Sequence, residues 1–320
     1  MRKLTLLLIA LVFVPAMLAA GCGGDDDDEA AGTTGTGAEL SGRIAADGSS
    51  TVGPLTTAAA ERFQRENSGV QVTVGVSGTG GGFERFCAGE TDLSNASRAI
   101  DDEEKQACES KGIEYTELQV ANDALTVVVN PQNDWADCLT VEQLKKIWDR
   151  GSKVDNWNQV DPQFSDERLQ LFGAGTDSGT FDYFTDVING EEGRSRSDYS
   201  ATEDDNVTVE GVAGDKGAMG YFGLSYFQQN SDRLKALEVD GGSGCVAPSA
   251  ETAQSGEYKP LSRPLFIYAK NESLQRPEVK AFLQYLLDNQ QEIAESAQFV
   301  PLEDEQLQKS KDALAGTGTA

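Results

Sequence analysis

From residue 41 onward, short runs of alternating or continuous apolar residues are followed by segments with an apolar residue at every third or fourth position. The first pattern predicts β-strands and the second predicts amphipathic α-helices. Strands are expected at Arg43–Ala46, Val70–Val76, Ala124–Val129, Leu169–Gly173 and Pro264–Lys270. Helices are expected at Leu55–Glu66, Phe83–Gly89, Asp101–Gly112, Val141–Trp148, Phe181–Ile188 and Pro277–Asn289. Repeated alternation of strands and helices is typical of an α/β fold in which helices cover both faces of parallel sheets.

The two ends of the chain follow other patterns. MRK precedes the apolar segment LTLLLIALVFVPAMLAA, which predicts a signal peptide over residues 1–21. The ending AAGC resembles a bacterial lipoprotein signal, in which Cys22 is lipidated; an ordinary signal peptide with a chance cysteine is the alternative. Residues 22–40 are acidic, small and poor in apolar side chains, so we expect a flexible tether. The last residues, DALAGTGTA, are expected to fray. We therefore expect an exported protein that is lipid-anchored to the outer face of the cell membrane.

Charge and composition exclude several classes of function. The chain has 26 Lys and Arg against 53 Asp and Glu, a formal net charge of −27, and loss of residues 1–21 would make it −29. Such an excess of negative charge argues against a nucleic-acid partner, which needs clustered positive charge. The chain contains no histidine, which excludes catalytic triads and zinc sites that depend on imidazole. We therefore expect no enzyme activity, no cofactor and no metal site.

Three turns rich in Gly, Ser and Thr precede predicted helices. They are DGSSTVGPL at 47–55, SGTGGGFERF at 77–86 and GTDSGTFDYF at 175–184. The first turns of a helix present free N–H groups and the positive end of the helix dipole, and glycine lets a ligand approach the backbone closely. One such turn is weak evidence, because most capped helices bind nothing. Three that converge would form an anion site without any lysine.

Four segments carry a resemblance to a known family. DGSSTVGPLTTAAAERFQ, VSGTGGGFERFCAGETDLSNASRAI, GAGTDSGTFDYF and GDKGAMGYFG resemble, in order and spacing, the substrate-binding protein of the bacterial high-affinity phosphate ABC importer. The resemblance implies a two-lobed periplasmic-binding-protein fold of type II, each lobe a sheet flanked by helices, with two crossover strands. Lobe 1 would hold residues 41–122 and 262–320, and lobe 2 residues 123–261. We expect a monomer that closes on inorganic phosphate and delivers it to the membrane subunits of an ABC permease.

The resemblance also implies a ligand set within the three turns. Two positions depart from the best-known members: Arg98 stands where they carry an aspartate, and Ala174 where they carry an arginine. We hypothesise that Arg98 supplies the cation from the opposite lobe and that Asp177 accepts a phosphate proton. The alternatives are a salt bridge for Arg98 and a turn or capping carboxylate for Asp177. The other expected ligand-binding residues are Ser50, Thr51, Val52 through its N–H, Thr79, Gly80, Ser178, Gly179 through its N–H, and Thr180.

A buried carboxylate would favour phosphate over sulfate, because sulfate at neutral pH carries no proton to share with it. Two alternative functions stay open: binding of another oxyanion, such as sulfate or molybdate, and a phosphate-sensing surface lipoprotein that feeds no transporter.

Once Cys22 is set aside, the remaining cysteines form an even set in an exported protein. Of the three pairings they allow, we favour Cys87–Cys108 and Cys138–Cys245, which keep each bond within one lobe; four buried thiols are the alternative.

Overall fold

The computed structural model describes residues 39–316 apart from Asp177, so the signal peptide, Cys22 and nearly all of the tether lie outside the described residues. The first elements alternate as the sequence predicts. They are β1 (Ser41–Gly48), α1 (Val52–Glu66), β2 (Gly69–Val74), α2 (Gly78–Cys87), β3 (Leu93–Ala96), α3 (Asp102–Ser110) and β4 (Tyr115–Val129).

The middle of the chain forms a second set of elements, and the C-terminal part returns to the first. The middle elements are β5 (Cys138–Thr140), α4 (Val141–Trp148), α5 (Trp157–Val160), β6 (Gln170–Ala174), α6 (Gly179–Phe184), η1 (Thr185–Asn189), β7 (Ser200–Thr202), α7 (Asp205–Gly214), β8 (Ala218–Gly223), α8 (Leu224–Gln229), β9 (Lys235–Ala236), β10 (Glu238–Asp240), β11 (Cys245–Val246) and α9 (Ala250–Gln254). The chain then forms β12 (Ser262–Lys270), η2 (Ser273–Gln275), α10 (Pro277–Asp288), α11 (Gln290–Ser296) and α12 (Asp304–Gly316).

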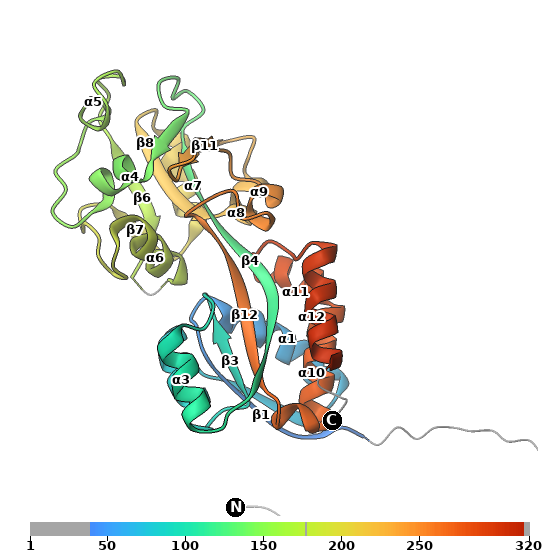
Figure 1. The fold of residues 1–320 in the computed structure, drawn as a ribbon. Coiled ribbons are helices and arrows are strands. Elements are labelled where there is room, and N and C mark those ends of the chain that lie inside the picture. Colours follow the sequence, from blue (N-terminus) through green and yellow to red (C-terminus); the bar gives the residue numbers. More distant parts are fainter. Residues whose placement is uncertain (1–38, 177, 317–320) are drawn as a thin grey trace, which may run out of the picture. The chain divides into compact units, whose positions relative to one another are not determined.

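Two long strands join the halves of the fold. The strand order is β2-β1-β3-β12-β4-β8-β6-β7, with β9 beside β4. The strands β12 and β4 are antiparallel and pair along their length, from Ser262 opposite Ala124 to Lys270 opposite Tyr115. Figure 1 shows β4 and β12 running side by side from one half into the other. These are two crossover strands, as the resemblance implies.

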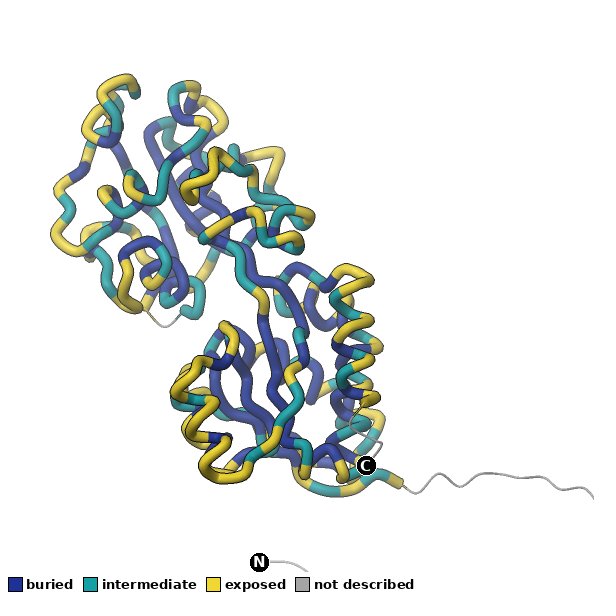
Figure 2. The backbone as a smooth tube through the Cα atoms, in the orientation of Figure 1, coloured by how far each residue is buried: buried dark blue, intermediate teal, exposed yellow. Residues whose placement is uncertain are grey.

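Each half has its own hydrophobic core. The core of the first lobe draws on apolar side chains between Ile44 and Ala121 and between Leu265 and Leu314. The core of the second lobe draws on side chains from Leu125 to Leu261. Smaller clusters on the opposite sheet faces pack against α2 and α3 in the first lobe and against α7 and α8 in the second. Figure 2 shows the same pattern, with buried residues along the strands and exposed residues on outer helices such as α3 and α12.

Local sequence explains why α4 matches its predicted bounds and why α1 begins earlier than predicted. The helix α4 begins where Thr140 and Gln143 form a capping box: the Thr140 hydroxyl accepts from the Gln143 N–H at 3.1 Å. The helix α1 buries Leu55, Ala59 and Phe63 along one face, as its apolar spacing predicts. It begins three residues before the predicted start because Pro54 is tolerated in the first turn of a helix.

Three expectations about local structure were wrong. Residues 79–82 were expected ahead of a helix, yet α2 already begins at Gly78, and a Cβ at Gly82 would lie 2.5 Å from the Cα of Gly48. The predicted strand Ala124–Val129 is only the second half of β4, whose first half carries polar side chains. The final segment, residues 312–320, was expected to fray, yet its first five residues belong to α12, which continues to Gly316 with Leu314 buried; residues 317–320 lie outside the described residues. Among the described residues no helix is both long and apolar enough to cross a bilayer.

The structure contains two disulfides, in the pairing that the sequence favoured. Cys87 at the end of α2 is joined to Cys108 in α3, and Cys138 of β5 is joined to Cys245 of β11. The first bond fastens two helices of lobe 1 to each other. The second bond crosses the small sheet β11-β10-β5 of lobe 2.

We predict that the two disulfides contribute unequally to stability. The Cys138–Cys245 bond closes a sequence separation of 107 residues and the Cys87–Cys108 bond a separation of 21. In the chain-entropy account, the paired serine substitution should lower the free energy of unfolding by roughly 4–5 kcal/mol for the long loop and about 3 kcal/mol for the short one. Urea unfolding of both double-serine variants checks this order, and a larger loss from the short loop would contradict it.

Candidate functional site

A cleft of about 660 Å³ lies between the two lobes, and residues of the crossover strand β12 line it. Its walls come from the turn before α1, the start of α2 and the loop after β3 in lobe 1, and from α6 and η1 in lobe 2. The segment that leads into β12 and the first residues of β12, among them Arg263, form its floor. The lining residues used below are Ser50, Thr51, Thr79, Gly80, Arg98, Asp182, Tyr183, Asp186, Glu192 and Arg263.

The turn before α1 is fixed by its own hydrogen bonds. The buried Ser49 hydroxyl accepts from the N–H groups of Thr51 at 3.2 Å and Val52 at 3.3 Å, and the Ser49 N–H donates to the Asn95 carbonyl at 2.9 Å. The Val52 N–H, an expected ligand donor, is therefore directed at Ser49, and Val52 does not line the cleft. Ser50 and Thr51 do line it, so the turn offers the cleft its hydroxyl groups.

Arg263 lies at the floor of the cleft and was missed by the sequence analysis. Its Nη2 donates to the Thr51 hydroxyl at 3.0 Å, and its Nε donates to the Asp123 carboxylate at 3.2 Å. The guanidinium carbon lies 3.6 Å from the centroid of the Tyr183 ring. The three contacts come from the turn before α1, from β4 and from α6, so one side chain joins both lobes to the crossover strands.

The Arg263–Asp123 pair is largely shielded from water. The Arg263 and Asp123 side chains are 17% and 8% exposed. Burial raises the pKa of Asp123, although the neighbouring Arg263 guanidinium acts in the opposite direction. The guanidinium still reaches the cleft, so a cation is held where an anionic ligand could meet it.

The turn before α6 meets the turn before α1. The Ser178 hydroxyl caps α6 by accepting from the Thr180 N–H at 3.1 Å. A Cβ on Gly179 would lie 2.8 Å from the Thr51 hydroxyl oxygen, so only glycine fits against that residue. Two of the three predicted turns are thus brought together, although the residues from Ser178 to Thr180 do not line the cleft itself. The predicted acceptor Asp177 lies outside the described residues.

Arg98, the cation predicted from sequence, lines the cleft from lobe 1 but is held by an ion pair. Its Nη1 and Nη2 donate to the two oxygens of the Glu104 carboxylate, both at 2.7 Å. The hydrogen bond to Glu104 is the main reason that the pKa of Arg98 is raised. The structure therefore has the salt bridge that was the alternative for Arg98, and its role toward a ligand stays a prediction.

Thr79 and Gly80 lie on the same wall as Arg98. The Thr79 hydroxyl accepts from the Ser97 N–H at 3.2 Å and lies 3.0 Å from the Ser97 hydroxyl. Gly80 lies beside the Arg98 guanidinium, which would be 4.0 Å from a Cβ at that position. The predicted turn at 77–86 thus faces the cleft from the lobe 1 side.

Acidic side chains line the lobe 2 wall. Asp182, Asp186 and Glu192 all face the cleft. Burial, and then the charge of Glu192, raise the pKa of Asp182, while Arg263 lowers it. A half-buried carboxylate near the candidate anion site can accept a proton that the ligand carries.

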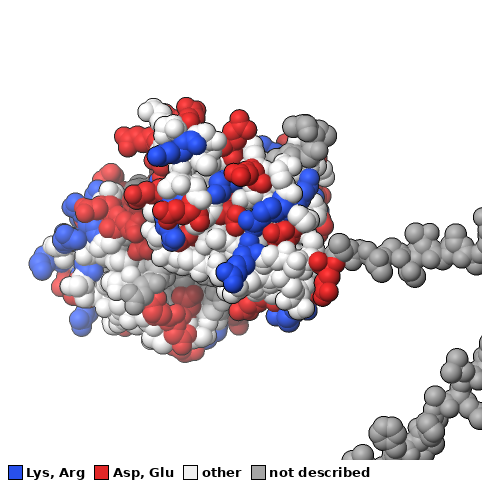
Figure 3. Space-filling model, turned by 90° about the horizontal axis from the view of Figure 1, so that it is seen from below, with Lys and Arg blue, Asp and Glu red and all other residues white. Residues whose placement is uncertain are grey.

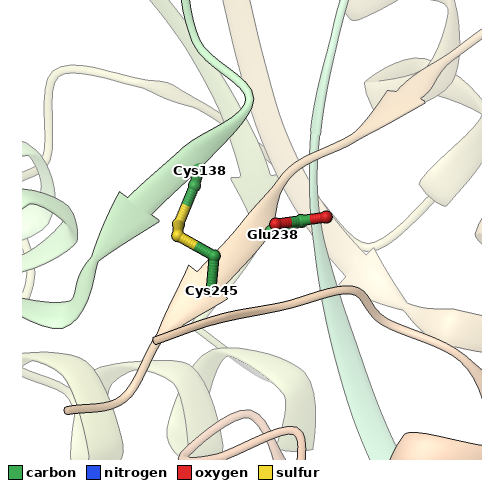
Figure 4. Close-up of side chains that lie close together, drawn as sticks. All are labelled: Cys138, Glu238 and Cys245. Carbon is green, nitrogen blue, oxygen red and sulfur yellow. A yellow bond between two sulfur atoms is a disulfide. The ribbon is translucent and has the colours of Figure 1, made fainter. Parts of the chain in front are cut away.

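The described residues include one cluster that could hold a metal by its spacing. Cys138, Glu238 and Cys245 place their ligand atoms within 4.8 Å of one another. Figure 4 shows Glu238 beside the bond between the two sulfur atoms. Because that disulfide occupies both sulfurs, the cluster offers no thiolate ligand.

Surface charge gives no sign of a polyanion-binding face in the view that Figure 3 draws. On that face Lys and Arg side chains are interspersed with Asp and Glu. Elsewhere among the described residues several basic side chains are held in ion pairs, among them Arg62 with Glu292 and Arg233 with Glu210, both at 2.9 Å.

Comparison with known proteins defines the family. A model described as a PBP superfamily domain matches residues 30–290. The phosphate-binding protein PstS of Staphylococcus saprophyticus is 40% identical over 263 residues, which cover 82% of this chain and 81% of PstS. The chain belongs to the PBP superfamily, in the family of substrate-binding proteins of the phosphate ABC importer. The family that the four sequence segments predicted is confirmed.

Other relatives agree with this family. Protein SphX of Synechococcus elongatus is 48% identical over 262 residues, covering 81% of this chain and 77% of SphX. The crystal structure of a possible phosphate binding protein from Planctomyces limnophilus matches with a TM-score of 0.85 at 48% identity, covering 88% of this chain and 100% of that one. The two-lobed PBP fold is thereby confirmed.

We predict that Arg263 keeps Asp123 from being an unpaired buried charge. Arg263→Met should lower the free energy of unfolding by roughly 3–5 kcal/mol at pH 8. The loss should shrink as the pH falls, because the raised pKa of Asp123 lets that carboxyl become neutral in the folded state. Adding Asp123→Asn should restore most of the loss.

Urea unfolding of the single and double variants at pH 5 and pH 8 checks this prediction. Arg62→Met is the matched control, since Arg62 pairs with an exposed Glu292 and should lose no more than about 1 kcal/mol. Equal losses in the single and double Arg263 variants would contradict the assignment.

Proposed function

We propose that this chain binds inorganic phosphate in the cleft and delivers it to an ABC permease for uptake. The observation that carries the proposal is Arg263, a cation at the floor of the cleft that donates to the Thr51 hydroxyl. Thr51 lies within the turn that resembles the phosphate turn of the family, and Gly179 of the second such turn packs against it. The relatives named for phosphate binding support the same ligand.

The proposed site holds phosphate by short-range contacts. Arg263 turns one edge toward Asp123 and the other toward the cleft, and a guanidinium can donate two parallel hydrogen bonds to phosphate oxygens. The hydroxyls of Ser50, Thr51 and Thr79 add donors that can rotate. No group in this set needs to ionise or react, so the site binds without performing chemistry on the ligand.

Arg263 is the stronger candidate for the principal cation, and Arg98 a weaker one. Both nitrogens at the tip of Arg98 are engaged by Glu104, and phosphate would have to compete with that carboxylate. Arg263 makes a single bond to a neutral hydroxyl on its cleft side, which phosphate can replace at little cost. This assignment supplies the positive charge that the arginine at the position of Ala174 provides in the best-known members.

The division of the chain into two lobes joined by β4 and β12 would allow the cleft between them to close on the ligand. We propose that residues 41–122 with 262–320 move as one body and residues 123–261 as the other, bending at β4 and β12. Phosphate favours the closed state only if it gains contacts there that the open state lacks. Contacts from both the α1 and α6 turns to one anion meet that requirement.

The proposal includes the place of the protein in the cell. The basic and apolar start of the chain, followed by Gly21-Cys22, supports export and lipidation of Cys22. The acidic tether after it would hold a monomeric binding protein near the permease. Mass spectrometry of the mature protein tests this part, since lipidation adds acyl chains at Cys22.

We predict that phosphate affinity depends more on Arg263 than on Arg98. Arg263→Lys keeps the charge beside Asp123 but loses the two-pronged donor, so the Kd for phosphate should rise about tenfold or more. Arg98→Lys should raise it about threefold at most. Isothermal titration of both variants decides, and the opposite order would favour the sequence hypothesis that Arg98 is the cation.

We predict that Asp182 contributes to the choice between phosphate and sulfate. A carboxylate in the cleft wall accepts a phosphate proton but faces only unprotonated oxygens in sulfate. Asp182→Asn should therefore reduce the ratio of sulfate Kd to phosphate Kd about tenfold. Asp186→Asn, on the same wall, is the matched control and should leave the ratio unchanged.

The same titrations separate the remaining alternatives. If Asp177→Asn rather than Asp182→Asn reduces the ratio, the acceptor is the one that the sequence suggested. A tighter Kd for sulfate or molybdate than for phosphate in the unmodified protein would favour another oxyanion. Phosphate binding without support of uptake in cells would favour a sensing lipoprotein.

A further inference from the structure

One carboxylate lies directly behind the arginine of the lobe 1 wall. Glu104, the third residue of α3, accepts two hydrogen bonds of 2.7 Å from Arg98, one at each carboxylate oxygen. The Arg98 side chain is 45% exposed and lines the cleft, whereas the Glu104 side chain is 15% exposed and does not line it. Glu104 therefore meets the cleft only through the Arg98 guanidinium.

The tip of Arg98 has little hydrogen-bonding capacity left for a ligand. Its Nη1 donates to Glu104 and, at 3.2 Å, to the Ala99 carbonyl, which uses both N–H groups of that nitrogen. Its Nη2 donates to Glu104, and the Asp101 carboxylate lies 3.7 Å from the same nitrogen. The two carboxylates also balance the positive charge. A phosphate at this wall would have to displace Glu104 to form a strong ion pair with Arg98.

Glu104 is held in place by the start of its own helix. With Asp101 it forms a capping box: the Asp101 carboxylate accepts from the Glu104 N–H at 2.8 Å, and the Glu104 carboxylate accepts from the Asp101 N–H at 3.0 Å. The Cys87–Cys108 disulfide fastens α3 to α2. The first turn of α2 carries Gly80, where a Cβ would lie 4.0 Å from the Glu104 carboxylate. The carboxylate is thus built into the wall by two helices.

The two arginines of the cleft differ in what their open edges meet. Arg263 is paired with Asp123 on one edge, while its other edge meets the neutral hydroxyl of Thr51. Phosphate can replace a hydroxyl at little cost, whereas at Arg98 it must compete with the full charge of Glu104. An anion that enters the cleft therefore finds one available cation and one that is already neutralised.

We propose that Glu104 is a positioning residue that sets the phosphate affinity of the cleft by withholding Arg98 from the ligand. The proposal rests on the proposed function, because it takes phosphate as the ligand. A carboxylate that competes with the ligand keeps the affinity below what two available arginines would give. A protein that delivers its ligand must also release it, and a built-in competitor for one arginine favours that release.

The substitution Glu104→Gln separates charge from structure. Capping boxes accept glutamine at the third helical position, and this chain uses Gln143 in that way at the start of α4. The amide oxygen can keep the bond to the Asp101 N–H, whereas the amide carries no charge to neutralise Arg98. The variant is therefore expected to fold, which urea unfolding checks.

Isothermal titration with inorganic phosphate tests the proposal on four full chains. They are the unmodified protein, Glu104→Gln, the double variant with Arg98→Met and Glu104→Gln, and Glu90→Gln as the matched control. Glu90 is a lobe 1 carboxylate bonded to Arg85 at 3.1 Å, and neither residue lines the cleft. Its substitution changes the net charge by the same amount as Glu104→Gln, so it measures the long-range part of the effect.

Glu104→Gln should lower the Kd for phosphate about threefold to tenfold, because Arg98 can then bond the ligand. The gain should disappear in the double variant, whose Kd should equal or exceed that of the unmodified protein. Glu90→Gln should change the Kd less than about twofold. Loss of a purely structural contact would not tighten binding only when Arg98 is present, so the comparison separates the two roles.

Three results would overturn the role of Glu104. They are an unchanged or higher Kd in the folded Glu104→Gln variant, an equal gain in Glu90→Gln, and an equal gain in the double variant. Glu104→Ala, which also frees Arg98, replaces the glutamine variant if that variant does not fold. Phosphate binding by the unmodified protein with no gain in the variant contradicts the Glu104 proposal alone, whereas absence of binding in all four chains contradicts the proposed function as well.

Discussion

The ion pair between Arg263 and Asp123 is the contact on which the rest of this account depends. It lies on the two crossover strands, and Arg263 also reaches Thr51 and the Tyr183 ring, so it connects both lobes beside these strands. A buried ion pair seldom stabilises a fold more than apolar side chains of the same size would. Its position at the floor of the cleft gives it another use: Asp123 holds the guanidinium in place, and the cleft edge of that group stays available to an anion.

The strongly negative charge of the chain constrains how such a site can work. With a net charge of −27, the surface as a whole repels phosphate at long range, and salt weakens that repulsion. Binding must then come from groups in direct contact with the anion: hydroxyls, N–H groups and one or two arginines. The half-buried Asp182 of the lobe 2 wall fits this picture, since it would penalise an anion that brings no proton. Selectivity and affinity would thus arise from the same few groups, those in direct contact with the anion in the cleft.

Sequence patterns predicted the parts of the fold in which local signals agree with tertiary packing. The α4 helix has a capping box and an apolar face, and the cysteine pairing follows once each bond is confined to one lobe. The first half of β4 was missed because this crossover strand runs between the two lobes. Polar residues such as Asp123 interrupt the apolar pattern by which a strand is predicted. Arg263 was missed for the same reason. The available signal was an arginine directly before the predicted apolar strand Pro264–Lys270, because a charge at such a place needs a partner.

The most direct test of the central claim is a crystal structure of the protein with inorganic phosphate bound. The account predicts one phosphate between the α1 and α6 turns, with Arg263 donating to its oxygens in place of the Thr51 hydroxyl and still bonded to Asp123. The hydroxyl of Thr51 should contact the same anion, and closure of the lobes should bring the turn at Gly179, which does not line the cleft in the structure described above, into contact with it as well. A phosphate held by Arg98, with Arg263 still donating to Thr51, would contradict the account.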